Sequence, residues 1–370
     1  MSESTEHPAE AIRDPEGYRQ ALEAWLRGKR PELEELRVHD LDMPTATGFS
    51  NETVFFSASW NENGVSSSQR YVARIEPMDG GMFPVQTPAT AISVALQHRV
   101  MDAVAATGVA PMPPTLPFEG DLSVLGRPFF VMEYVPGRIP AEIPRYTLEG
   151  YLVDEATPAE RERMVRNGIE NMAALNRLDW QEAGLHWLDA SGEGKPSMAV
   201  QLALYRDYAV SELVGREHPV MMRALDWLDR NVTEPPAGLA WGDARLGNMI
   251  WQDYECVAIL DWEAAALSPP EADIGWWVMF DRMSFDDMGA PRLEGFPTRE
   301  EMVAYWEELT GRRVGDILYW EIFSAMRFCA VFIRLGGRFI RAGLAPADST
   351  VAVDNMVTVA LAKLLDEAGA

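Results

Sequence analysis

The sequence predicts an α+β protein of two lobes, a small antiparallel β-sheet lobe followed by a larger, mainly helical one. Three observations support this prediction. The chain has 370 residues, whereas a single hydrophobic core stops growing at roughly 250–300 residues. Alternating apolar residues, which are typical of half-buried strands, are concentrated before about residue 133. After the break at Pro136, apolar residues recur mostly at helical spacing.

The expected boundaries follow from these changes in pattern. We expect residues 1–15 to form a loose tail, because they are acidic and polar. Residues 16–133 are expected to form the first lobe and residues 134–370 the second. The start of the chain has no basic segment followed by an apolar one, so a secretory signal peptide is not expected.

In the first lobe, residues 16–26 have the pattern of a short amphipathic helix that ends at Gly28. A cluster of turn residues then precedes alternating apolar residues over 54–60, which predict a strand. The segment QRYVARIEP predicts its partner strand across a polar turn, TAISVALQHRVMDAVAATG predicts a helix, and RPFFVMEYV predicts a buried strand.

In the second lobe, a capping pattern at Thr157 and Glu160 predicts a helix start. The helices expected there are PAERERMVRNGIENMAALNRL, PVMMRALDWLDRN, REEMVAYWEELTG, DILYWEIFSAMRFCAVFIRLG and STVAVDNMVTVALAKLLDEAG. Four tryptophans at helical spacing are expected to be core residues: Trp276, Trp277, Trp306 and Trp320.

Charge and composition narrow the class of function. The net charge of −25 argues against a DNA or RNA partner. It would favour a cationic small molecule, although a merely acidic surface is the simpler interpretation. Both cysteines lie in apolar runs, which predicts no disulfide and favours a reducing cytoplasm. The apolar run near the end contains Arg327 and Arg334, so no membrane span is expected.

One stretch carries candidate chemistry, LAWGDARLGNMIWQDYECVAILDWE over residues 239–263. Two short strands, 248–251 and 256–260, flank a turn and predict a hairpin whose outer ends meet. Asn248 and Asp261 would then face one point, where an amide oxygen and a carboxylate suit Mg²⁺. Asp243 lies one short loop earlier and could accept a proton from a substrate hydroxyl.

The spacing of Asp243, Asn248 and Asp261 matches the protein-kinase pattern of a catalytic Asp, an Asn five positions later and a metal-binding Asp further on. Over roughly residues 40–340 the chain resembles the aminoglycoside phosphotransferase family, part of a wider choline-kinase-like and protein-kinase-like group. It is most similar to the kinase-like domains fused to some acyl-CoA dehydrogenases. The fold implied is the two-lobed protein-kinase-like fold.

The resemblance implies a phosphotransferase that uses ATP and Mg²⁺ to phosphorylate a hydroxyl of a small molecule. By the same resemblance, Asp243 is the base, Arg245 lies near the γ-phosphate, and Asn248 and Asp261 hold the metal. The acceptor is expected to be cationic or a hydroxy-acyl compound. The first lobe would bind the nucleotide, and the second would carry catalysis and the acceptor.

Residues of the first lobe are also assigned by resemblance. Ser50 and Asn51 lie in the turn that covers the phosphates. Arg74 stands on the strand that usually carries a phosphate-binding lysine. The hinge that binds adenine through its backbone corresponds to the segment around Glu133 and Val135.

Three positions depart from the family pattern. Trp241 replaces the His of the catalytic loop, Gln97 stands where a Glu would pair with Arg74, unless that Glu is shifted to another position, and Asn176 occupies a position where His is common. Asp273 is expected to support the loop through its backbone. The alternative hypothesis is a degenerate kinase-like protein that binds nucleotide as a sensor or scaffold.

A second segment, GEGKPS at residues 192–197, superficially resembles a phosphate-binding loop. The complete pattern of such loops is absent, because Pro196 follows Lys195. We therefore expect this segment to be a surface turn.

Overall fold

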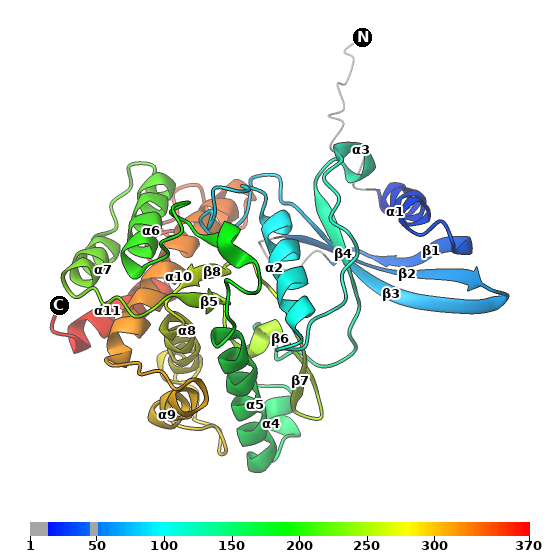
Figure 1. The fold of residues 1–370 in the computed structure, drawn as a ribbon. Coiled ribbons are helices and arrows are strands. Elements are labelled where there is room, and N and C mark those ends of the chain that lie inside the picture. Colours follow the sequence, from blue (N-terminus) through cyan, green and yellow to red (C-terminus); the bar gives the residue numbers. More distant parts are fainter. Residues whose placement is uncertain (1–13, 45–50) are drawn as a thin grey trace, which may run out of the picture. The chain divides into compact units, whose positions relative to one another are not determined.

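The computed structural model describes residues 14–44 and 51–370 (Figure 1). They divide into two compact units. Unit 1 contains the described residues up to Gly81 together with Ile92–Asp102 and Pro113–Val135. Unit 2 contains Met82–Ala91, Ala103–Met112 and Pro136–Ala370. The four-stranded sheet lies in unit 1 and most helices lie in unit 2, which confirms the expected α+β class.

Two global expectations can be checked directly. Cys256 and Cys329 are both free thiols, as their apolar surroundings predicted. Among the described helices, none combines the length and the apolar character that crossing a bilayer would require.

The frame of unit 1 is an antiparallel sheet with strand order β1–β2–β3–β4. Its strands are β1 (Glu34–Asp42), β2 (Glu52–Glu62), β3 (Val65–Ile75) and β4 (Phe129–Glu133). The two-residue turn between β2 and β3 is Asn63-Gly64, with φ values of 52° and 78°. The type I′ turn, one of the two turns favoured in hairpins of this length, needs positive φ at both positions, and Asn-Gly is the pair that adopts them most easily.

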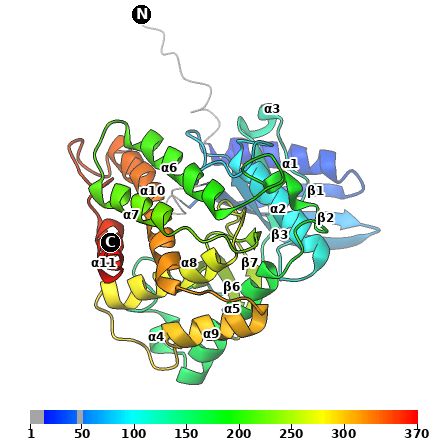
Figure 2. The same cartoon turned by 60° about the vertical axis from the view of Figure 1, so that its left-hand side comes forward.

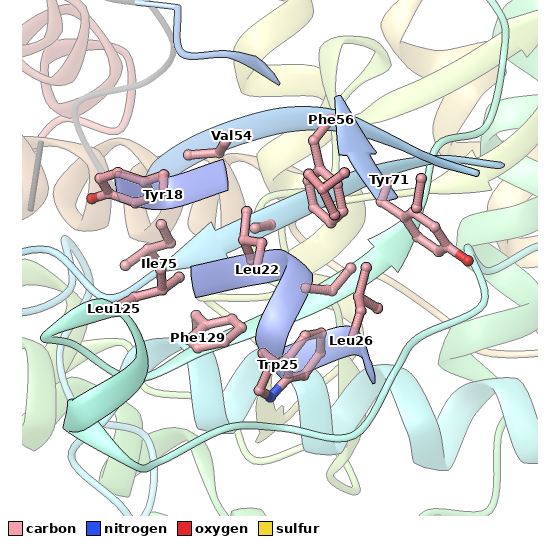
Figure 3. Close-up of a cluster of buried hydrophobic side chains, with 14 of the residues drawn as sticks. Tyr18, Leu22, Trp25, Leu26, Val54, Phe56, Tyr71, Ile75, Leu125 and Phe129 are labelled. Carbon is pink, nitrogen blue, oxygen red and sulfur yellow. The ribbon is translucent and has the colours of Figure 1, made fainter. Parts of the chain in front are cut away.

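Helix α1 (Pro15–Lys29) packs against the sheet of unit 1 (Figure 3). Its start is determined locally, because the side chain of Asp14 accepts the N–H of Glu16 and Pro15 occupies the first turn. The helix therefore begins one residue earlier than expected and runs three residues further. Its buried side chains and their strand partners form one core cluster: Tyr18, Leu22, Trp25, Leu26, Val54, Phe56, Ile75 and Phe129.

Two further helices begin in unit 1, α2 (Ser93–Thr107) and α3 (Leu122–Leu125). The start of α2 is capped from the sheet, since the Glu76 carboxylate accepts the N–H groups of Ser93 (3.1 Å) and Val94 (2.9 Å). Burial raises the pKa of Glu76, and these hydrogen bonds oppose the rise. The capping residue is thus distant in sequence from the helix that it stabilises.

Unit 2 is organised around the long helix α10 (Ile317–Arg341), which packs on α6, α7, α8 and α11 (Figure 2). The helices of unit 2 are α4 (Tyr151–Asp154), α5 (Pro158–Asn176), α6 (Met198–Leu213), α7 (Pro219–Arg230), α8 (Glu271–Arg282), α9 (Arg299–Thr310), α10 and α11 (Met356–Glu367). Short helical turns are η2 (Leu185–Leu188), η3 (Leu246–Asn248) and η4 (Met283–Asp287). Two small antiparallel pairs join β5 (Gly238–Ala240) to β8 (Ala266–Ser268) and β6 (Met249–Gln252) to β7 (Glu255–Ile259).

Helix boundaries in unit 2 follow from their caps. The capping box at Thr157 and Glu160 forms as predicted at the start of α5. The last expected helix is too long at its start, because residues 349–355 are not helical and α11 begins only at Met356. Asn355 determines this start, since its side chain accepts the N–H groups of Val357 and Thr358. Strand β1 and helix α6 were not predicted.

A buried acid at the end of α8 makes the stability of unit 2 depend on pH. Asp281 is buried and pairs with Arg292 (Nη1 to Oδ2, 2.8 Å). Burial raises the pKa of Asp281 to about 6, against the opposing effect of Arg292. The folded protein therefore binds this proton more tightly than the unfolded chain does. The contribution of protonated Asp281 to the stability of the fold is complete below the pKa of the unfolded chain and is lost as the pH rises towards 6.

We expect the wild-type free energy of unfolding to fall between about pH 4 and pH 6, relative to Asp281→Asn, by on the order of 2–3 kcal/mol. Asn has no titrating group, so its own curve lacks this component. Urea unfolding of both proteins at several pH values measures the difference. Parallel pH curves for the two proteins would contradict the prediction.

Candidate active site

The β6–β7 hairpin brings Asn248 and Asp261 to neighbouring positions. Met249 pairs with Ile259, and the N–H of Leu260 donates to the carbonyl of Asn248 (2.8 Å). Asn248 ends the short turn η3 instead of beginning the strand. Asp261 follows the second strand with φ of 57°, a left-handed conformation that is uncommon outside glycine. Residues held in this region are often found at functional sites.

Three donors hold the carboxylate of Asp243. Its Oδ1 accepts the indole N–H of Trp276 (2.8 Å) and Nε–H of Arg245 (3.0 Å), and its Oδ2 accepts Nδ2–H of Asn248 (2.7 Å). Each carboxylate oxygen has about two lone-pair sites. Oδ1 is therefore saturated, whereas Oδ2 retains one acceptor position. Asp243 is only 8% exposed, so this position is fixed by its surroundings.

Arg245 lies between two carboxylates. Besides Asp243, its guanidinium contacts Glu142 and lies 5.5 Å from the ring centroid of Phe280. Burial alone would lower the pKa of Arg245, but the negative charges of Asp243, Glu142 and Asp261 raise it above its ordinary value. The side chain is thus a permanent cation that lies within electrostatic reach of both candidate acidic residues.

A buried carboxylate supports the Asp243 loop, residues 241–248, from behind. Asp273 in α8 accepts the backbone N–H groups of Trp241 and Gly242, each at 2.8 Å, and Nδ2–H of Asn176 at 2.8 Å. The expected supporting role of Asp273 is confirmed. Burial raises the pKa of Asp273, and these three hydrogen bonds oppose the rise. Trp276, which lies one turn further along α8, reaches Asp243 directly.

Gly242 has a backbone conformation that excludes a side chain. Its φ is 90°, and a Cβ atom there would lie 2.1 Å from the carbonyl oxygen of Ala264. The carbonyl of Gly242 also accepts Nη2–H of Arg327 (3.0 Å), a buried arginine whose guanidinium lies 4.8 Å from the ring centroid of Trp276. The glycine before Asp243 is therefore required for steric reasons.

Asn176, one of the three departures from the family pattern, is a hydrogen-bonding centre. Besides Asp273, its amide N–H group reaches the carbonyl of Leu239 (3.2 Å), and its oxygen accepts the indole N–H of Trp306 (2.9 Å). An amide can donate and accept at once, so a neutral Asn satisfies both sides of this buried position.

Trp241, at the position where the resemblance implies a catalytic-loop His, does more than pack. Its indole is completely buried, and Nε1–H donates to the carbonyl of Leu260 (2.9 Å). It also packs against Trp262, with ring centroids 6.1 Å apart. The hydrogen bond connects the Asp243 loop to the peptide immediately before Asp261. Trp241 is therefore placed to position Asp261.

We expect Trp241→Phe to lower the free energy of unfolding by about 2–3 kcal/mol, because it leaves a small cavity and an unpaired, partly buried carbonyl. Under the proposal that Asp261 holds Mg²⁺, the Mg²⁺ concentration that gives half-maximal phosphotransfer should also rise. Trp241→His keeps a ring N–H and should lower this concentration part of the way back to the wild-type value. The matched control is Trp320→Phe, since Trp320 is equally buried and donates to Val314 (3.1 Å) away from the loop. An unchanged Mg²⁺ requirement in Trp241→Phe would contradict the positioning role.

The residues assigned to the nucleotide lie in unit 1. Arg74 is on β3, and its Nη1–H donates to Oγ1 of Thr53 (2.9 Å). Nε2–H of Gln97 donates to Oγ of Ser93 (3.1 Å), so pairing between Gln97 and Arg74 stays a prediction. Asn51 is 2% exposed.

The assigned hinge follows the edge strand β4. The N–H of Glu133 donates to the carbonyl of Pro114 (2.8 Å), and the N–H of Tyr134 donates to that of Arg70 (2.9 Å). Glu133 and Val135 are both partly exposed. Ser50, the remaining predicted contact, lies outside the described residues.

Several residues of the site were not predicted as such, namely Glu142, Trp276 and Arg327. Glu142 lies in a loop without a recognisable motif. Trp276 was assigned to the core, and Arg327 was noted only as a charge in an apolar run. Their roles depend on which helix faces contact the Asp243 loop.

Curated proteins that are similar to this chain are named as members of the acyl-CoA dehydrogenase family. The chain is 27% identical over 296 residues to acyl-CoA dehydrogenase family member 11 of Rattus norvegicus, covering 76% of this chain and 34% of that protein. It is 30% identical over 244 residues to the protein of the same name from Gallus gallus, covering 64% of this chain and 27% of that protein. The chain thus spans about a third of the length of these relatives.

Solved structures show the same fold. A putative aminoglycoside phosphotransferase from Ralstonia eutropha is 25% identical, with a TM-score of 0.62 over 93% of this chain and 98% of that chain. A thermostable mutant of aminoglycoside phosphotransferase APH(4)-Ia, in ternary complex with ADP and hygromycin B, is 13% identical, with a TM-score of 0.57 over 95% of this chain and 99% of that chain. At that identity the second similarity concerns the fold alone.

The family model of the phosphotransferase enzyme family (APH) matches residues 43–309. This range includes the Asp243 loop, the β6–β7 hairpin and the supporting residue Asp273. The chain therefore belongs to the phosphotransferase enzyme family.

Proposed function

We propose that this protein transfers the γ-phosphoryl group of ATP to a hydroxyl of a small molecule. The observation that carries the proposal is the carboxylate of Asp243, whose three donors leave one acceptor position on Oδ2. A carboxylate held in this way can orient a hydroxyl without first reorganising.

Asp243 accepts the proton of the acceptor hydroxyl while that oxygen forms a bond to the γ-phosphorus. The bond between the γ-phosphorus and the bridging oxygen breaks, and ADP carries away the electron pair. Arg245 supplies a fixed positive charge beside Asp243. Since phosphoryl transfer depends chiefly on positioning and charge stabilisation, these groups suit the reaction.

Asn248 and Asp261 are the proposed Mg²⁺ ligands, and their donor chemistry fits this ion. Both N–H groups of the Asn248 amide point to Asp243, to its carbonyl (3.0 Å) and its Oδ2 (2.7 Å). The amide oxygen therefore points elsewhere, and with the Asp261 carboxylate it offers hard oxygen ligands. Over residues 14–44 and 51–370 there is no group of three or more His, Cys, Asp or Glu side chains suited to a metal. Bound Mg²⁺ would neutralise phosphate charge and would complete its shell with water and phosphate oxygens.

For the nucleotide, the proposal assigns contacts in unit 1. Arg74 would contact the α- and β-phosphates, with Asn51 and Ser50 in the phosphate-covering turn. The backbone groups of Glu133 and Val135 would bind adenine. Support for these assignments comes from membership of the family and from the placement of Arg74 on β3 and of Glu133 on β4.

Experiment has to decide which class of acceptor is phosphorylated. The solved neighbours carry the name aminoglycoside phosphotransferase, and the curated relatives the name acyl-CoA dehydrogenase. A screen should therefore contain aminoglycosides and amino alcohols as cationic acceptors, and hydroxy-acyl compounds as the alternative.

The direct test is calorimetric titration with ATP in the presence of Mg²⁺, followed by transfer assays over this panel. We expect ATP to bind and at least one acceptor class to be phosphorylated. Absence of nucleotide binding would refute the proposal. Tight ATP binding without transfer to any acceptor would favour the sensor or scaffold alternative.

A further inference from the structure

A second candidate site lies in unit 2, and its lining does not include Asp243 or Arg245. A cavity of about 770 Å³ opens where the end of α5, the turn 191–197, the end of α9 and the residues before β5 meet. This volume is in the usual range for small-molecule sites. Its lining includes three basic residues, Arg177, Lys195 and Arg312, and one acidic residue, Asp179. We propose that this cavity binds a small organic anion through a phosphate or carboxylate group.

Basic residues outnumber acidic ones in this lining, although the chain as a whole is acidic. The protein has a net charge of −25 and only three lysines. Lys29 and Lys363 form ion pairs with Glu119 (3.0 Å) and Asp287 (2.7 Å). Lys195 makes no ion pair with any residue of the described ranges 14–44 and 51–370. In a chain rich in acidic residues, this lysine is available for an anionic ligand.

The turn that carries Lys195 is fixed in place. The carboxylate of Asp189 accepts the N–H groups of Gly194 (2.7 Å), Lys195 (3.1 Å) and Ser191 (3.1 Å). The backbone of Lys195 is thereby anchored, while its exposed side chain lines the cavity. The segment GEGKPS is a surface turn, as expected, but its lysine borders a cavity.

The two arginines are also held. Arg312 donates to both carboxylate oxygens of the buried Glu271 (2.8 and 3.1 Å). Nη1–H of Arg177 donates to the carbonyl of Leu309. A guanidinium carries five N–H donors, so each arginine keeps further donors for a ligand. Pre-positioned cations lose little entropy on binding an anion, which favours affinity.

The acidic residue of the lining is already engaged in local structure. Oδ1 of Asp179 accepts the N–H groups of Gln181 (2.9 Å) and Glu182 (3.1 Å). The negative charge of Asp179 offsets one positive charge of the lining, and Arg312 is paired with Glu271. The two other basic residues, Arg177 and Lys195, therefore keep the lining net positive.

The test uses the full-length chain without nucleotide and with a chelator in place of divalent ions. Inorganic phosphate, pyrophosphate and citrate are titrated separately by calorimetry, at low and at high salt. We expect saturable binding that weakens with salt. Binding of pyrophosphate but not citrate would identify phosphate as the recognised group, and the reverse would identify carboxylate.

Matched lysine variants locate the site. Lys195→Gln should weaken binding of the best anion roughly tenfold. Lys363→Gln removes the same charge from a lysine remote from the cavity and should bind as the wild type does. Circular dichroism confirms that each variant is folded.

Two outcomes would overturn the inference. One is no saturable binding of any of the three anions. The other is equal weakening by Lys195→Gln and Lys363→Gln, which would mean that the anions respond to overall charge. Neither outcome depends on whether the protein transfers phosphate, because no nucleotide or acceptor is present in this experiment.

Discussion

Replacing Asp243 with Asn is expected to lower the rate of phosphoryl transfer by roughly 10²–10⁴, the usual contribution of a positioned base. Asn has nearly the same shape but cannot accept the proton of the acceptor hydroxyl. Its amide N–H group would also face the donors that now hold the carboxylate, Trp276, Arg245 or Asn248. Both effects act on the chemical step, so ATP binding should persist.

Single-turnover transfer and calorimetric ATP titration, each on wild type and Asp243→Asn, separate these effects. Asp226→Asn is a suitable control, because Asp226 is an exposed acid on α7 whose ion pair with Arg206 is at 3.5 Å. It should leave both quantities unchanged. Wild-type transfer rates in Asp243→Asn would refute the proposed role of Asp243, whereas loss of ATP binding would show that the charge serves the nucleotide instead.

Removal of the Asp273 carboxylate is expected to have the largest effect on stability. In Asp273→Ala, the buried N–H groups of Trp241 and Gly242 and the amide of Asn176 lose their acceptor. Unsatisfied buried donors of this kind cost about 1–3 kcal/mol each, and partial relaxation reduces the sum. We expect the free energy of unfolding to fall by about 3–5 kcal/mol.

Asp273→Asn should be almost as harmful, although it keeps the size of the side chain. An Asn amide offers one oxygen, so at least one of the three donors would face another N–H group. Urea unfolding followed by tryptophan fluorescence measures both variants, with Asp226→Ala as the exposed control. A loss below about 1 kcal/mol in both variants would show that the loop does not depend on Asp273.

Much of the site was predictable because its geometry is local. Asn248 and Asp261 flank a short hairpin, and antiparallel pairing brings the ends of a hairpin together whatever surrounds it. Asp243 is five residues before Asn248, so a single tight loop suffices for the contact between them. The capping box at Thr157 and the Asn63-Gly64 turn were predictable for the same reason.

Contacts between distant segments were not predictable in this way. Glu142 reaches Arg245 across 103 positions of sequence, and no periodic pattern marks that residue. Trp276 has the spacing of a core residue, and its burial is the same whether or not its indole N–H meets Asp243. A pattern of apolar residues predicts that a side chain is buried, but it does not predict which polar atom the side chain meets.

The sequence by itself determined the class of fold, the hairpin and the order of the acidic residues, since these depend on interactions among near neighbours in the chain. Only the tertiary structure decided how Asp243 is held, because its donors include Trp276 and the support of its loop comes from Asp273 and Arg327, all on helices α8 and α10. It also decided that Trp241 is hydrogen-bonded to the peptide before Asp261 and that Lys195 borders a cavity. The physical reason is that a hydrogen bond requires two atoms to meet at one distance and angle, and for distant residues that meeting is set by the packing of whole elements.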